Sequence, residues 1–179
     1  MHRDVKTGSI RSMAGVTLLE AKVTMTIAAI LLALGIPGLI DFTRNARRDS
    51  QVSDIVVALN YARSEAIRRN HNITVCPSAN GLDCNDTRQW ETGWIVFTDP
   101  NSNGVIDDSD SILRVREGTE GDTTLRGART RLTYQSTGFS AGFNDTLRVC
   151  DLRGTDFSRS VIISSTGRVR VKSKADTCP

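Results

Sequence analysis

The chain has 179 residues, of which 39% are hydrophobic and 24% charged, and its formal net charge is +3. About 139 residues follow Ile40, enough for one domain with a modest core but too few for two. The absence of internal repeats and low-complexity segments excludes a repeat array and a long flexible linker.

A short basic leader precedes an apolar segment. Residues 1–13 carry Arg3, Lys6 and Arg11, and no charge interrupts the run of about 18 residues from Val23 to Ile40. That length is the lower limit for a membrane-spanning helix. The positive leader predicts that the N-terminus stays in the cytoplasm while the bulk of the chain faces the other side.

The segment differs from a cleavable secretory signal, whose small-residue cleavage site follows the apolar region. Here the small-residue junction Ala14-Gly15 precedes it, so we expect the anchor to survive processing. Glu20 is also unusual, because a carboxylate inside an apolar segment needs a partner or a function. The alternative is an uncleaved signal anchor with a stray glutamate.

Gly15, the run Val16-Thr-Leu-Leu and Glu20 together resemble the class III signal of type IV pilins and type II secretion pseudopilins. The resemblance implies that prepilin peptidase cleaves between Gly15 and Val16 and methylates the new N-terminus. It also implies that Glu20 pairs with a neighbouring subunit's terminal amine during assembly, which would make its burial tolerable. Two positions depart from the family: Val16, where phenylalanine is usual, and Lys22, where an apolar residue is usual.

A second helical segment is expected to continue the anchor. Its apolar residues recur with the spacing of one helical face: Val52, Ile55, Val56, Leu59, Ala62, Ala66 and Ile67. We expect a transmembrane or filament-core helix over 16–42 and an amphipathic helix over 43–70. Pro37, within Gly35-Ile-Pro-Gly38, predicts a kink or local unwinding.

After Asn70 the pattern changes to short β-branched or alternating runs, which predict a β-rich head over 71–179. Turn residues separate about seven expected strands, in a mostly antiparallel sheet system with one face covering the helix. The expected strands are Ile73 to Cys76, Trp94 to Thr98, Ile112 to Glu117, Arg131 to Gln135, Thr146 to Cys150, Val161 to Ser164 and Arg168 to Lys172. A hairpin turn is expected at Ser165-Thr-Gly167.

Charge is divided unevenly along the head. Residues 71–125 hold three basic and ten acidic side chains, whereas residues 126–179 hold ten basic and four acidic ones. Such asymmetry fits either an anionic partner or subunits that pack acidic face against basic face.

All four cysteines follow the anchor, and an even number in an exported segment predicts two disulfides. Three connectivities are possible. We favour Cys76 with Cys84, which closes a short loop, and Cys150 with Cys178, which ties down the C-terminal tail.

The run from Asp99 to Asp110 matches a calcium loop in part. Its candidate ligands are Asp99, Asn101, Asn103, Asp107 and Asp110, but the last position lacks the usual glutamate and the flanks are expected strands. A polar hairpin loop explains the same residues. No metal site is otherwise expected.

Two further stretches, Gly93-Trp-Ile-Val-Phe-Thr-Asp99 and Cys76-Pro-Ser with Cys84, resemble the head of H-type pseudopilins and FimT/FimU minor pilins. Cys150-Asp-Leu-Arg-Gly and Ser165-Thr-Gly-Arg-Val-Arg-Val continue the resemblance over nearly the whole chain. It implies an α+β pilin fold, in which a long N-terminal helix packs on a mostly antiparallel head. It also implies an inner-membrane anchor with a periplasmic head, and other minor pilins, pseudopilins and the major pilin as partners.

The last expected strand carries alternating cations. Arg168, Arg170, Lys172 and Lys174 would lie along one outer face, each about 6.7 Å from the next, with Val169 and Val171 facing inward. A phosphate backbone suits such a ladder. In FimT-type minor pilins a Gly-Arg-x-Arg tail is associated with DNA binding during natural transformation.

Gly167, Arg168 and Arg170 fit that tail residue for residue. An edge strand charged against unwanted pairing, or a contact with the next subunit, explains the same residues. The basic run from Arg126 through Arg129 to Arg131 either extends this surface or is a solvated loop.

The sequence contains no nucleophile elbow, phosphate loop or metal-ligand cluster. We therefore expect no enzymatic activity and no cofactor. The interpretations that remain open are a minor pilin at a filament tip, with or without a role in DNA uptake, and an H-type pseudopilin of type II secretion.

Overall fold

The computed structural model describes residues 15–119 and 121–178. These fall into two compact units, one ending at Asp41 and the other beginning at Phe42. Helix α1 (Leu18–Arg69) contributes its first part to one unit and its second part to the other.

In the first unit, α1 presents apolar side chains to its surroundings on all sides. Leu18, Leu31 and Leu39 are each more than 60% exposed. By length and composition α1 can cross a membrane. Of the two outcomes expected at Pro37, local unwinding is wrong, because α1 stays helical through this residue, and the kink stays a prediction. A proline removes only one hydrogen bond of the helix, and the bonds on either side can maintain it.

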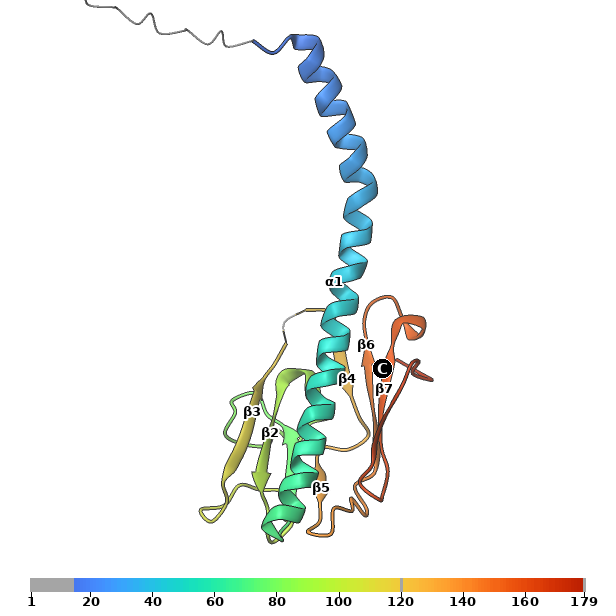
Figure 1. Ribbon diagram of the computed structural model, residues 1–179. Helices are drawn as coiled ribbons and strands as arrows, with labels where there is room; N and C mark the ends of the chain where they lie inside the picture. The colour runs from blue at the N-terminus through green and yellow to red at the C-terminus, as the bar shows by residue number, and fades with distance from the viewer. Residues whose placement is uncertain (1–14, 120, 179) are drawn as a thin grey trace, which may run out of the picture. The chain divides into compact units, whose positions relative to one another are not determined.

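The second unit is a head of two four-stranded antiparallel sheets (Figure 1). The first sheet has the order β3-β2-β1-β5 and the second has the order β4-β6-β7-β8. The strands of the first sheet are β1 (Ile73–Pro77), β2 (Gly93–Thr98), β3 (Ile112–Glu117) and β5 (Leu132–Tyr134). Those of the second are β4 (Thr124–Arg126), β6 (Asp145–Cys150), β7 (Arg159–Ile163) and β8 (Val169–Lys172). Two short 3-10 helices, η1 (Trp90–Thr92) and η2 (Thr155–Phe157), complete the elements.

All seven expected strands are present, with ends that differ from the expected ones by at most two residues. Strand β4 was missed, because it has only three residues and adjoins a basic stretch that resembles a loop. It is nevertheless paired along its length with β6, from Thr124 opposite Cys150 to Arg126 opposite Arg148.

The main core lies between the head portion of α1 and the inner faces of both sheets (Figure 1). Most of the predicted apolar stripe is buried there, including Ile55 and Leu59 with no exposed surface. Ile67 departs from the stripe and is 53% exposed. Trp90 and Trp94 complete this core from the first sheet and the 3-10 turn before it.

The outer face of the first sheet is covered by a separate apolar cluster. Cys76, Ile95 and Phe97 lie fully buried there, with Cys84 and Ile106 packed against them. A disulfide joins Cys76 to Cys84, as favoured from the sequence. The loop that it closes therefore helps to cover this sheet.

The outer face of the second sheet is covered only at one end. The disulfide between Cys150 and Cys178, also the favoured pairing, holds the C-terminal tail near the end of β6. The backbone N–H of Ala175 in this tail donates to Ser158 Oγ at 2.7 Å. Further along the sheet, Thr146, Arg148 and Ile162 are half-buried, and Arg170 is exposed.

Candidate functional site

The predicted processing junction lies immediately before α1. Gly15 and Val16 are exposed, and the helix begins at Leu18. Thr17 caps it, because its hydroxyl accepts the backbone N–H of Glu20 at 3.2 Å. Residues 1–13 of the expected leader, and Ala14, lie outside the described residues.

Glu20 stands exposed in the first turn of α1, among exposed apolar side chains. Within the described part of this unit, its carboxylate forms no ion pair with Lys22. Residues two apart point in different directions on a helix, so Lys22 is poorly placed to compete for it. The geometry leaves Glu20 available to a group from outside the chain.

The candidate calcium loop connects β2 and β3. Asp99 is fully buried, and its carboxylate accepts hydrogen bonds from Thr74 Oγ1 at 2.6 Å and from Gly104 N–H at 3.1 Å. The side-chain amides of Asn101 and Asn103 both donate to Asp107, at 2.9 and 3.0 Å.

Asp110 accepts the backbone N–H of Asp107 at 2.9 Å. Contacts within a polar hairpin loop thus account for much of the hydrogen bonding of these side chains. Among the described residues, no group of three or more His, Cys, Asp or Glu is placed to hold a metal ion. Calcium binding therefore stays a prediction of the sequence.

The C-terminal hairpin is the region that best fits a binding surface. β7 and β8 pair from Ser160 opposite Lys172 to Ile163 opposite Val169. The turn between them is closed by hydrogen bonds from Gly167 N–H to the Ser164 carbonyl at 2.9 Å and from Ser164 N–H to the Arg168 carbonyl at 3.0 Å. The hairpin turn expected at Ser165-Thr-Gly167 is therefore present.

Gly167 has a structural reason to be glycine. Its φ of +74° lies in the left-handed region, and a Cβ at this position would collide with the carbonyl oxygen of Gly138. Gly167 is buried and offers no side chain to a ligand. Its contribution to the predicted site is to shape the turn that presents Arg168.

The four predicted cations divide into two pairs. Arg168 and Arg170 are exposed, and within the described residues their guanidinium groups form no hydrogen bond or ion pair. Lys172 instead forms an ion pair with Asp176 at 2.9 Å, and Lys174 forms one with Asp156. The two lysines of the expected ladder are therefore already paired with acids, whereas in the described part of the chain the two arginines are not.

These ion pairs change the pKa values of the two acids. The hydrogen bond from Lys172 lowers the pKa of Asp176 below its ordinary value, and the hydrogen bond from Lys174 does the same for Asp156. Both pairs are exposed to solvent, so each contributes little to stability. They do reduce the positive charge that this end of β8 offers to an anion.

The valines of β8 also differ partly from expectation. Val169 is half-buried against the main core, whereas Val171 is 50% exposed. Val171 does lie opposite the buried Val161. It remains exposed because β8 is the edge strand and no further strand covers it.

Sequence reasoning missed Arg148 of β6. On the outer face of the second sheet, β7 separates this residue from β8. A hollow of about 460 Å³ is lined by side chains from these three strands, among them Arg148, Ile162 and Arg170. The alternation of polar Thr146 and Arg148 with apolar Leu147 and Val149 was the available signal.

Arg126 lies directly opposite Arg148 on the neighbouring strand. Its charge is already matched, because Arg126 forms an ion pair with Glu91 at 2.5 Å. The cations of this face that form no ion pair among the described residues are therefore Arg148, Arg168 and Arg170, of which Arg148 lies near enough to Asp176 to help lower the pKa of that carboxylate.

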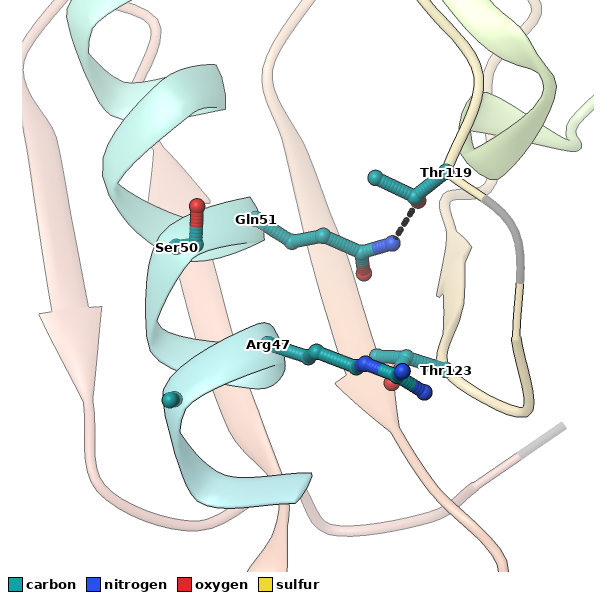
Figure 2. A pocket seen from close by; sticks show the side chains of 6 residues that line it. Arg47, Ser50, Gln51, Thr119 and Thr123 are labelled. Carbon is teal, nitrogen blue, oxygen red and sulfur yellow. Dashed lines mark hydrogen bonds between the residues drawn. The ribbon is translucent and has the colours of Figure 1, made fainter. Parts of the chain in front are cut away.

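A different hollow lies beside α1 (Figure 2) and is lined by Ala46, Arg47, Ser50, Gln51, Thr119 and Thr123. Gln51 donates a hydrogen bond to Thr119, and its side-chain oxygen is buried without a partner among the described residues. In Figure 2 the Arg47 side chain lies beside Thr123. This hollow presents one cation and no catalytic group.

Comparison with known proteins gives a consistent result. The family model of type II transport protein GspH matches residues 51–167, which is more than half of the chain. No curated protein matches the sequence.

Two solved structures share the fold, both of the Pseudomonas aeruginosa (strain PAO1) type IV minor pilin FimU. The structure in space group P21 is 23% identical with a TM-score of 0.62, and the match covers 77% of this chain and 99% of that chain. The structure in space group P65 is 21% identical with a TM-score of 0.58, covering 73% of this chain and 99% of that chain.

At these identities the likeness is one of fold, and it confirms the expected α+β architecture of a long helix on antiparallel sheets. The resemblance to H-type pseudopilins and FimT/FimU minor pilins is confirmed as well. The chain belongs to the GspH family and is a structural subunit of the minor pilin or pseudopilin type, not an enzyme.

Proposed function

We propose that this protein is a minor pilin that prepilin peptidase processes between Gly15 and Val16, with methylation of Val16. The position of the junction supports this, because it lies just before the capped start of α1 at Leu18. Glu20, one turn into the helix, would then pair with the terminal amine of a neighbouring subunit.

The exposed apolar surface of α1 supports assembly into a filament. Side chains such as Leu31, Leu34 and Leu39 are exposed in the described part of this unit. Lipid of the inner membrane covers them before assembly, and helices of other minor pilins and the major pilin replace the lipid afterwards. The head then stands in the periplasm and later at the tip of a type IV pilus or a related filament.

We further propose that the head contacts the phosphate backbone of double-stranded DNA for uptake. One observation carries this proposal: Arg168 and Arg170 are exposed and lack hydrogen-bond and ion-pair partners for their side chains in the described part of the chain. Guanidinium groups bind phosphate oxygens bidentately. Contacts to the backbone carry no base information, so no sequence preference is expected.

A DNA titration of the full-length protein in non-ionic detergent tests this surface. We expect salt-sensitive binding that Arg168→Ala/Arg170→Ala weakens by about tenfold or more at low salt. Lys172→Ala/Lys174→Ala is the matched control, because it removes the same charge from residues that are already paired with acids. Equal losses in both variants would show that only net charge matters.

An H-type pseudopilin of type II secretion is the alternative, and the match to the GspH model favours it. A deletion strain separates the two functions. Loss of DNA uptake or piliation with normal protein secretion supports the minor pilin. Loss of secretion, together with no DNA binding by the purified protein, supports the pseudopilin.

A further inference from the structure

The loop between β4 and β5 carries two more arginines, and a buried acid fixes its position. The carboxylate of Asp145 accepts backbone N–H groups from Ala128, at 3.0 Å, and from Arg129, at 3.0 Å. Asp145 is only 9% exposed. These backbone bonds hold the loop against the start of β6 and leave the side chain of Arg129 on the surface.

Beside this loop the head forms a hollow of about 340 Å³ that is lined by Arg88, Ala128, Arg129, Thr130, Arg131 and Phe143. Three of these six residues are arginines and none is acidic. The hollow therefore concentrates positive charge contributed by segments that are distant in the sequence.

Two of the three guanidinium groups here are oriented by neutral partners. Those of Arg129 and Arg131 lie 6.0 and 5.8 Å from the ring centre of Phe143. Arg129 Nε donates to the carbonyl of Asn144 at 3.1 Å, and Arg131 donates to the carbonyl of Asn103. Neither contact neutralises the charge. Arg88 is exposed, and its side chain has no hydrogen bond or ion pair within the described residues.

This hollow shares a lining residue with the one on the outer face of the second sheet. Ala128 lines both, so the surface around Arg148 and Arg170 adjoins the surface around Arg129. A polyanion with regularly repeated charges can occupy both hollows at once, which an isolated carboxylate cannot do.

We propose that the hollow lined by Arg88, Arg129 and Arg131 is a second phosphate-binding position, reached by DNA that passes from β8 over Ala128. This inference rests on the proposed DNA contact of β8 and extends it across the head. Guanidinium groups that are oriented but not neutralised bind phosphate oxygens with little rearrangement.

The test uses the full-length protein in non-ionic detergent and a double-stranded DNA probe, with Arg88→Ala/Arg129→Ala as the variant. We expect about tenfold weaker binding at low salt. The slope of log affinity against log salt should also fall by nearly two, because each phosphate contact contributes about 0.9. Arg131 is left in place because it also holds the neighbouring loop.

Two controls separate phosphate contact from other effects. Arg47→Ala/Arg114→Ala removes the same charge from exposed positions that line neither hollow, and we expect it to bind nearly as well as wild type. Arg88→Lys/Arg129→Lys keeps the charge and should retain most of the salt slope. Unfolding midpoints of all variants establish that they are folded.

The outcomes distinguish this inference from the proposed function. Unchanged affinity and slope in Arg88→Ala/Arg129→Ala, with binding lost in Arg168→Ala/Arg170→Ala, would overturn the second position and leave the β8 contact standing. If Arg47→Ala/Arg114→Ala weakens binding equally, the loss of affinity is an effect of net charge, and the second phosphate-binding position is overturned. No binding by the wild type would overturn both proposals.

Discussion

The two sheets of the head differ in how much of their outer faces is covered. On the first sheet, the loop closed by Cys76 and Cys84 and the side chain of Ile106 cover Ile95 and Phe97, so β1 and β2 are buried on both faces. On the second sheet the C-terminal tail covers one end, and the rest of the face presents arginines to solvent.

This difference separates stability from binding. In the first sheet, β1 and β2 use both faces for apolar burial, which is the main source of folding free energy. The second sheet uses only its inner face for the core, so its outer face is free to carry charges that help neither packing nor burial. A binding surface is therefore expected on the second sheet, and each prediction below tests that division.

The largest effect is expected from truncation on the covered face. Phe97 is fully buried, and Phe97→Ala should lower the free energy of unfolding by about 4 kcal/mol. Ile162→Ala on the open face should lower it by less than about 1 kcal/mol. Urea titrations followed by tryptophan fluorescence measure both, since Trp90 and Trp94 are buried. Similar losses in the two variants would contradict the division.

Opening the disulfide-closed loop that covers the first sheet should have the next largest effect on the free energy of unfolding. The disulfide between Cys76 and Cys84 closes a loop with a sequence separation of 8, and replacing both cysteines with alanine should cost about 2–3 kcal/mol. DNA affinity at low salt should fall by less than in Arg168→Ala/Arg170→Ala, because Arg168 and Arg170 lie on the other sheet. A large loss of affinity in a folded variant would show that the two faces are coupled.

A smaller effect on stability, with a clear effect on binding, is expected at Gly167. Gly167→Ala introduces a left-handed alanine and a collision with the Gly138 carbonyl, which should destabilise the head by about 2 kcal/mol. Because the turn also presents Arg168, DNA binding should weaken as well. Gly142→Ala is the matched control, since it has a similar φ of +79° but open space for the Cβ. Binding by Gly142→Ala should be unchanged.

The smallest effect on stability is expected on α1, away from the outer faces of both sheets. Hydrogen bonds from Arg68 and Arg69 lower the pKa of Glu65 on α1 from 4.5 to about 2. The folded pKa is therefore below the unfolded value. The stabilising contribution is complete above about pH 4.5 and is lost as the pH falls towards 2.

Glu65→Gln should accordingly lose about 1 kcal/mol at pH 6, and the difference from wild type should shrink at pH 3. Urea titrations at both pH values measure this change. A difference that stays constant between the two would show that Glu65 contributes by packing and not by charge.

The sequence predicted the fold well because its signals are local. The stripe from Val52 to Ala66 identifies the buried face of α1, and alternating runs identify seven of the eight strands. The predicted burial of Ile67 was wrong, because the last turns of a helix can extend beyond the core that covers the rest of it. Strand β4 was not predicted, because three residues are too few to show an alternating pattern.

The candidate site was predicted only in part. Arg168 and Arg170 follow from a motif in one strand. The pairing of Lys174 with Asp156 could not be predicted, because it depends on how the tail folds back across the sheet. Arg88 and Arg129 lie far apart in sequence, so only the fold brings them to one hollow.

The positions of the two disulfides have a consequence for the order of maturation. Neither pair belongs to the core between α1 and the two sheets, since each disulfide lies at an outer face of the head. We therefore expect the exported chain to collapse around α1 before any thiol is oxidised. Oxidation would then act on a head that is already folded, and the disulfides would stabilise the fold without directing its formation.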